Sequence, residues 1–229
     1  WFALRITGMP ALHTIAASTG PVIAMEAPKV GPRHTGEYDW IRVVRHEYVH
    51  TVTLSRTNNR IPHWFTEAAA VHLEGGPRDY GAATHRARAA RDGELFDMSK
   101  INIAFVRPDK PTDRSQAYAQ GHWMYEFIVE RWGEDAPLDL MDQYAAGARE
   151  DAAMQSVPGL SQEQFFEAFK PWAAAQVRTW GMMPEPSIDA IVAEWAAKDD
   201  DWRAQARATL VGAAEAFAFR TSGAAGSRM

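Results

Sequence analysis

The feature that most constrains the fold of this chain is the spacing of apolar residues in the segment 37–54. Ile41, Val44, Tyr48 and Val52 recur at intervals of three and four residues, which is the period of one face of an α-helix. Asn58-Asn59 follows and ends the pattern. The spacing therefore predicts an amphipathic helix over 37–54.

A second helix is predicted over 62–74, because Pro62 can open a helix without loss and Gly75-Gly76-Pro77 ends one. Similar patterns predict helices over 82–91, 115–132, 137–146 and 161–180, with an irregular stretch over 93–113. Before them, residues 12–17 and 22–26 flank Ser18-Thr19-Gly20-Pro21 and predict two short strands joined by a turn, and residues 2–7 alternate loosely. The expected class is α+β, mainly helical, with a small N-terminal sheet.

The chain is expected to form a main domain over 1–182 and a helical annex over 183–229, with the boundary at Met183-Pro184-Glu185-Pro186. The main domain holds the sheet within 1–30, the helices 37–54 and 62–74, and a helical lower half over 82–182. The annex is predicted to hold a helical pair over 187–219, followed by a flexible tail rich in Gly, Ser and Ala from Arg220.

Composition excludes several classes of protein. Acidic residues outnumber basic ones by 29 to 24, and no Lys/Arg-rich run occurs, which argues against a nucleic-acid partner. No stretch approaches the roughly 18 apolar residues of a membrane-spanning helix, so no transmembrane segment is expected. The chain has no cysteine, which leaves histidine and carboxylate as the strong ligands for a transition metal. It starts at Trp1 without an initiator Met, and is expected to be a fragment or a processed form of a longer chain.

The string His46-Glu47-Tyr48-Val49-His50 lies within the first predicted helix. Two histidines four residues apart present their imidazoles on one face of a helix, at a separation that one zinc ion can bridge. Glu47 then lies beside the metal, where a carboxylate can take a proton from the attacking water and pass it to the leaving amine. The string therefore predicts a hydrolytic metal site.

The third metal ligand is expected from another segment. Metzincins continue the motif with Gly and His, but Thr53 and Arg56 stand at those positions here. The segment Pro62-His63-Trp64-Phe65-Thr66-Glu67-Ala68-Ala69-Ala70 resembles the Trp-(Leu/Phe)-x-Glu-Gly-x-Ala segment with which gluzincin zinc metallopeptidases supply a glutamate ligand. Ala68 replaces the usual Gly, which changes packing but removes no ligand. The resemblance implies one Zn²⁺ per chain, held by His46, His50 and Glu67.

This resemblance is to the bacterial peptidase-MA-like group and covers about residues 20–145. It implies a zincin-like fold, in which a small sheet lies over the active-site helix and a cleft separates both from a helical lower half. It also implies zinc-dependent hydrolysis of peptide bonds in a peptide or protein substrate, with Glu47 as general base and then general acid. An exported, cell-envelope setting is a further expectation drawn from such relatives.

Gluzincins commonly place a Tyr or His to donate a hydrogen bond to the oxyanion that forms in the transition state. The resemblance implies Tyr118 for this role, because it follows Glu67 in the order that such peptidases show. His122 lies one helical turn further on and is the alternative donor.

Val22-Ile23-Ala24-Met25-Glu26-Ala27 partly resembles the Gly-Ala-Met-Glu-Asn strand of aminopeptidases, whose Glu binds the free amine of the substrate. Glu26 is therefore a candidate substrate-binding residue. If Glu26 is only a carboxylate on an edge strand, the cleft is open at that end and the enzyme is an endopeptidase, which is the favoured prediction.

A different class of function is a noncatalytic module that retains the zincin architecture and binds a peptide or protein, with a structural metal or none. A fourth protein ligand would favour this hypothesis, because a catalytic zinc ion keeps one coordination position for water. The sequence offers no obvious fourth ligand.

Overall fold

The computed structural model describes residues 14–32, 34–76, 80–182, 192–194, 207 and 209–211. The chain divides into two units, Trp1–Met183 and Pro184–Met229. In the second unit the described residues are helical. Apart from them, the predicted annex helices and tail lie outside the described residues, as does the loosely alternating segment 2–7.

In its described residues the first unit is mainly helical and has one small antiparallel sheet, which confirms the expected class. Its strands pair Ala16 with Met25 and Ser18 with Ile23. The two strands joined by a turn were predicted, but β1 begins at Ala16 and includes Ser18, which had been assigned to the turn. No helix among the described residues is long and apolar enough to cross a membrane. The elements are β1 (Ala16–Ser18), β2 (Ile23–Met25), α2 (Trp40–Arg56), α3 (His63–Leu73), α4 (Tyr80–Asp92), α5 (Ile101–Val106), α6 (Asp113–Trp132), α7 (Ala136–Ala145), α8 (Glu150–Ser156) and α9 (Gln162–Thr179).

The structure corrects three further details of the predicted elements. Helix α2 begins at Trp40 rather than at residue 37, because the side chain of Asp39 accepts the backbone N–H of Arg42 and caps the helix. The stretch 93–113 is not irregular throughout, since it contains α5. The seven-residue helix α8 was not predicted, because so short a segment shows no clear helical period.

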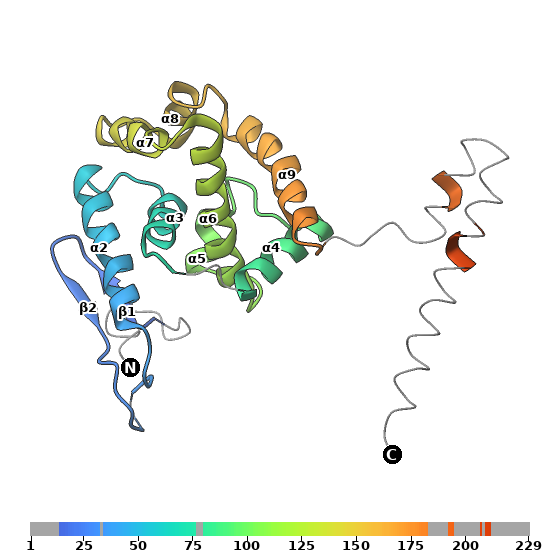
Figure 1. Cartoon of the computed structure of the whole chain (residues 1–229). Helices are drawn as coiled ribbons and strands as arrows, with labels where there is room; N and C mark the ends of the chain where they lie inside the picture. The colour runs from blue at the N-terminus through green and yellow to red at the C-terminus, as the bar shows by residue number, and fades with distance from the viewer. Residues whose placement is uncertain are drawn as a thin grey trace, which may run out of the picture. The chain divides into compact units, whose positions relative to one another are not determined.

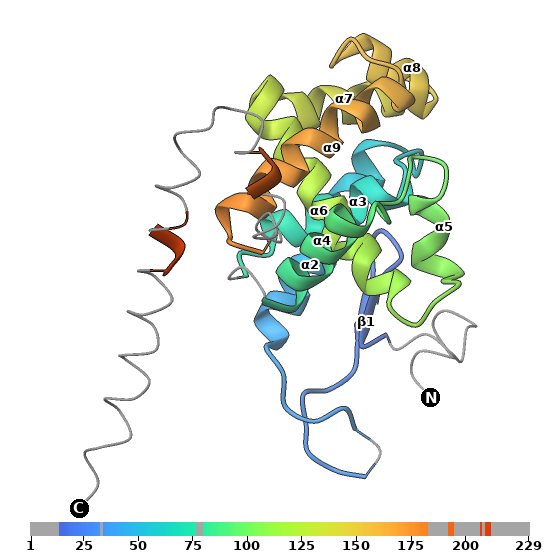
Figure 2. The ribbon, with the colours of Figure 1, turned by 90° about the vertical axis from the view of Figure 1, so that its right-hand side faces the viewer.

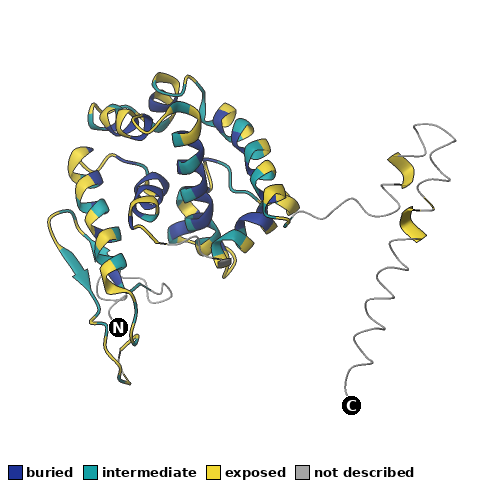
Figure 3. Ribbon diagram, viewed as in Figure 1, coloured by how far each residue is buried: buried dark blue, intermediate teal, exposed yellow. Residues whose placement is uncertain are grey.

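Helix α3 is the centre of the first unit. It packs against α2 on one side and α6 on the other (Figure 1). Seven consecutive residues, from Trp64 to Ala70, are buried, and Figure 3 shows α3 dark blue along most of its length whereas α2 has an exposed outer face. Five of these seven residues are apolar, and a helix with apolar residues on most of its faces belongs inside a protein. The methyl group of Ala68 faces Gly121 of α6, so the residue that departs from the family pattern packs where α6 has no side chain.

The hairpin and the helices α7 and α8 lie at opposite ends of the first unit in both views (Figures 1 and 2). Both strands pack against α2, and the hydroxyl groups of Ser18 and Thr51 lie 3.2 Å apart. Hydrogen bonds from Glu26 N to Ile15 O and from Thr19 N to Val22 O join the strands. Because backbone direction alternates along a strand, Ala16 and Ser18 direct their N–H and C=O groups to the opposite edge of β1.

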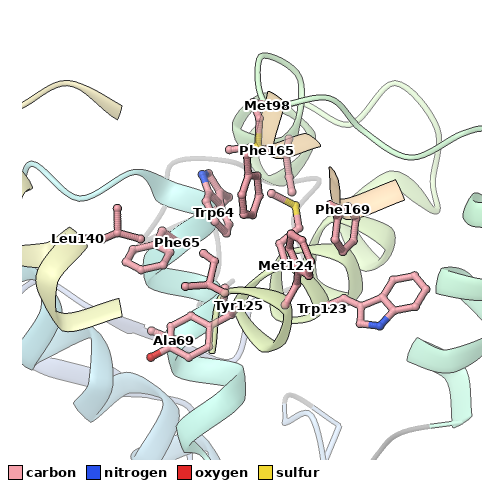
Figure 4. Packing of buried hydrophobic residues seen from close by; sticks show 14 of the residues in the cluster. Trp64, Phe65, Ala69, Met98, Trp123, Met124, Tyr125, Leu140, Phe165 and Phe169 are labelled. Carbon is pink, nitrogen blue, oxygen red and sulfur yellow. The ribbon is translucent and has the colours of Figure 1, made fainter. Parts of the chain in front are cut away.

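The core on the other side of α3 is largely aromatic. Trp64 and Phe65 of α3 lie beside Met124 and Tyr125 of α6, and Phe165 and Phe169 of α9 close the cluster (Figure 4). Trp123 and Phe169 meet edge to face, with ring centres 5.7 Å apart, a geometry that adds to the effect of burial. This packing holds α6, and with it the residues that α6 presents to the site.

We predict that Phe169→Ala lowers the free energy of unfolding by about 3–5 kcal/mol, because it leaves a cavity where Phe169 is 0% exposed. Leu138→Ala is the control, since Leu138 is 44% exposed and its loss should cost less than about 1 kcal/mol. Urea denaturation followed by circular dichroism measures both values. Equal effects of the two substitutions would contradict the packing described here.

Candidate metal centre

His46, His50 and Glu67 come together where α2 packs against α3. The Nε2 atoms of the two histidines lie 3.2 Å apart. Oε2 of Glu67 lies 3.3 Å from Nε2 of His46 and 3.4 Å from Nε2 of His50. This group could hold a metal ion. Oε2 of Glu67 is also buried without a hydrogen-bond partner among the described residues, which is unusual for a carboxylate oxygen.

The other ring nitrogen of each histidine is held by a second partner. Nδ1 of His46 lies 2.9 Å from Oε2 of Glu74, and Oε1 of Glu74 accepts from the guanidinium of Arg42. A carboxylate can only accept, so Nδ1 of His46 carries the hydrogen and Nε2 is the atom left for a metal.

The same assignment follows for His50 from a chain of hydroxyl groups. Thr53 Oγ1 donates to the carbonyl of His50, and Thr66 Oγ1 lies 2.7 Å from Thr53 Oγ1. Thr66 therefore donates to Thr53 and accepts from Nδ1 of His50, which is 2.9 Å away. Nε2 of His50 again faces the cluster.

Sequence reasoning did not identify Glu74 or Thr66. Glu74 follows Glu67 by seven residues, or two helical turns, and this spacing was the available signal. Thr66 directly precedes Glu67, and nothing in its spacing marked it, because its role depends on the packing of α3 against α2.

The carboxylates shift the charge state of the cluster. Burial alone would lower the pKa of His46, but Glu67 and Glu74 outweigh burial and raise it to about 9. Burial alone would raise the pKa of Glu67, but the adjacent imidazoles of His46 and His50 hold it well below its usual range. Glu67 is therefore ionised, as a metal ligand must be.

Glu47 lies beside this cluster on α2 and is 6% exposed. Burial raises the pKa of its carboxyl group, whereas the nearby histidines and the backbone N–H of Ser18 in β1 lower it. The raised pKa moves Glu47 toward the range in which a carboxylate can accept a proton and release it again.

Three adjoining cavities border the cluster, and His46 and Tyr118 line all of them. The inner cavity, of about 300 Å³, contains Glu47, His50 and Glu67. The central cavity, of about 800 Å³, contains Glu47 and Ala16 of β1. The outer cavity, of about 410 Å³, contains His122 but not Glu47. The first two are large enough for amino-acid side chains of a substrate.

The two candidate oxyanion donors differ in their surroundings. Tyr118 lines the inner cavity, and burial and the charge of Glu67 raise the pKa of its phenol, so the phenol keeps its proton. His122 accepts a hydrogen bond at Nδ1 from Nη2 of Arg86, at 2.7 Å, because a guanidinium can only donate. Its Nε2 lies 3.8 Å from Oε1 of Glu126. The geometry brings Tyr118, and not His122, into the inner cavity.

The carboxylate of Glu26 is hydrogen-bonded to the loop that follows β2. Its two carboxylate oxygens accept from the backbone N–H and the hydroxyl of Thr35, at 2.8 and 2.7 Å. Its backbone carbonyl accepts from the hydroxyl of Tyr38. Glu26 does not line any of the three cavities.

Two further residues of the inner cavity carry chemistry that no motif indicated. Nε2 of His63 lies 3.6 Å from Oε1 of Glu67, and burial lowers the pKa of His63. Arg114 lines both the inner and the central cavity, and its Nη2 lies 3.5 Å from the hydroxyl of Tyr118. Both residues stand four positions before a candidate site residue on the same helix, which was their only signal.

A buried His-His-Glu group beside a carboxylate in a cavity is the arrangement expected of a hydrolytic enzyme. A sequence model of the Peptidase MA superfamily matches residues 30–175, which include the whole cluster. The chain belongs to the Peptidase MA superfamily, which supports a peptidase-like enzyme with peptide substrates. Searches of curated proteins and of solved structures gave no match.

We predict that Glu74→Ala weakens metal binding by about 10–100-fold, because His46 loses the partner that orients its ring. Glu74→Gln should weaken it less, since the amide oxygen can still accept from Nδ1 of His46. Competition with a chromophoric chelator measures the affinity, and Glu130→Ala, on the exposed end of α6, is the control. An unchanged affinity in Glu74→Ala would show that Glu74 does not support the cluster.

Proposed function

We propose that this chain is a zinc-dependent peptidase of the gluzincin type with a zincin-like fold, and that His46, His50 and Glu67 hold one Zn²⁺. The observation that carries the proposal is the triangle formed by the three ligand atoms, with sides of 3.2, 3.3 and 3.4 Å. Tetrahedral zinc with bonds of about 2.0–2.2 Å separates its ligand atoms by roughly 3.3–3.6 Å. The donor set and the orphaned Oε2 of Glu67 fit the ion.

When bound, zinc supplies a Lewis acid that polarises the scissile carbonyl and increases the acidity of water. Glu47 takes a proton from the attacking water and gives it to the leaving amine. Its raised pKa suits this exchange better than an ordinary exposed carboxylate. Tyr118 donates its phenol hydrogen to the developing oxyanion, and its raised pKa keeps that hydrogen in place.

Among the described residues, no strand pairs with the edge of β1 that faces away from β2, and this edge is suited to hold the backbone of the substrate. Ala16 and Ser18 turn their backbone groups away from β2, and both residues line the inner cavity with Glu47. An extended peptide can pair with such an edge as an added strand. Because Glu26 is hydrogen-bonded to Thr35, it is not presented to a substrate amine, and we infer an endopeptidase rather than an aminopeptidase.

The noncatalytic alternative has less support. Within the part of the chain that the structure describes, the group that could hold a metal ion has three members and no fourth ligand. Three protein ligands leave the open position that catalytic zinc sites keep.

We predict that Glu47→Gln retains zinc near one ion per chain but lowers kcat for peptide hydrolysis by at least about 100-fold, because the amide cannot take up the proton. Inductively coupled plasma mass spectrometry measures the metal, and cleavage of a peptide library measures activity.

His46→Ala and Glu67→Ala are the matched variants, and each should lose both zinc and activity. His72→Ala is the control, because His72 is exposed on the same helix as Glu67. Full activity in Glu47→Gln would refute the mechanism, and a parent protein that takes up no zinc would refute the proposed function.

A further inference from the structure

The search beyond the proposed zinc site leads to Arg114, in the first turns of α6. Its guanidinium carbon lies 5.6 Å from the centre of the Tyr118 ring, and Nη2 lies 3.5 Å from the Tyr118 hydroxyl. Because Tyr118 itself lines the inner cavity with Glu47 and Glu67, the guanidinium is separated from the zinc ligands by a single phenol group. Arg114 is thus placed beside the bond that the proposed chemistry would cleave.

Arg114 also faces both halves of the cleft. It lines the inner cavity and the central cavity, and the two cavities also share His46, Glu47, Tyr118 and Ala16 of β1. A substrate strand that pairs with β1 and presents its carbonyl near His46 would therefore pass Arg114 at the residues that flank the scissile bond.

Arg114 is the arginine that the inner and the central cavity share. Arg42, the other arginine of the central cavity, does not line the inner cavity. Among the described residues of the inner cavity, Arg114 is the one arginine or lysine.

A guanidinium is always charged, and its fork of N–H donors matches a carboxylate. With its metal ion bound, the inner cavity holds two positive charges from zinc and one from Arg114 against the carboxylates of Glu47 and Glu67. The cavity therefore favours an anionic group over a cationic one.

We propose that Arg114 binds a substrate carboxylate next to the scissile bond, so that the enzyme prefers acidic peptides. The carboxylate is either an Asp or Glu side chain or the C-terminal carboxylate of a short peptide. This inference rests on the proposed peptidase function and adds a substrate class to it.

The test uses quenched-fluorescence peptides on the zinc-loaded protein. Each peptide has alanine around the scissile bond except at one flanking position, which is Glu, Ala or Lys. A second set varies the C-terminus, as a free acid or an amide, close to the bond. In the first set, the parent protein should cleave a Glu peptide with kcat/KM about 10-fold above that of its Ala counterpart. Alternatively, in the second set, kcat/KM for a free-acid peptide should exceed that for its amide by the same factor. The set that shows the ratio identifies the source of the carboxylate.

In Arg114→Gln this ratio should fall close to one, and Arg114→Glu should reverse it in favour of Lys peptides. Arg107→Gln is the matched control, because Arg107 is exposed at the end of α5 and does not line the cavities. The control should keep the ratio of the parent. Fluorescence anisotropy with labelled Glu and Ala peptides, in the Glu47→Gln background, gives the same preference as a ratio of dissociation constants without turnover.

The outcomes separate the two proposals. A parent that cleaves peptides without an acidic preference, or an Arg114→Gln variant that keeps the preference, overturns this inference and leaves the peptidase intact. A fall in kcat that is equal for Glu, Ala and Lys peptides also overturns it, because Arg114 would then act through Tyr118. A parent that cleaves no peptide counts against the peptidase, and the anisotropy ratio then decides whether Arg114 recognises a carboxylate.

Discussion

The site depends on one packing constraint, which is the position of α3 between α2 and α6. Because α3 is buried from Trp64 to Ala70, its rotation about its own axis is determined by the core: Trp64 and Phe65 must face the aromatic cluster, and Ala68 must face Gly121. Successive residues of an α-helix are about 100° apart around its axis. A rotation of α3 by this angle would carry Glu67 away from the histidines of α2. The hydrogen bond between Thr66 and Thr53 couples the two helices at the same level. The packing of the core therefore also determines where Glu67 lies relative to His46 and His50.

The parts of this arrangement that a local pattern can show were predicted from the sequence. The spacing of His46 and His50 places both on one face of a helix, and the apolar segment around Glu67 predicts the next helix. Glu74 and Thr66 could not be found in this way, because their roles depend on which faces of α2 and α3 meet. The same limit applies to the ends of α2 and to the short helices α5 and α8. Capping by Asp39 set the start of α2, and no periodic pattern reports such a contact.

Tyr118 and His122 show how far sequence reasoning about a site residue can go. They lie four residues apart on α6, so helical spacing places both toward the same region and cannot rank them. They differ in their neighbours: Arg86 from α4 holds His122, whereas Tyr118 lies near Glu67 of α3. Contacts between helices, which no spacing within α6 reveals, also bring Arg114 and His63 into one cavity. The cavity residues that the sequence did not predict are thus brought together by contacts between helices that are distant in the sequence.

The two carboxylates of the inner cavity are driven in opposite directions by their surroundings. Both are buried, and burial alone would raise the pKa of each. For Glu67 the two adjacent imidazoles outweigh burial and keep the carboxylate ionised, as a ligand requires. For Glu47 burial prevails, and the negative charge of Glu67 raises its pKa further. Two carboxylates whose pKa values are pushed apart can take different roles in one reaction. The candidate ligand, Glu67, and the candidate base, Glu47, are therefore distinguished by their environments.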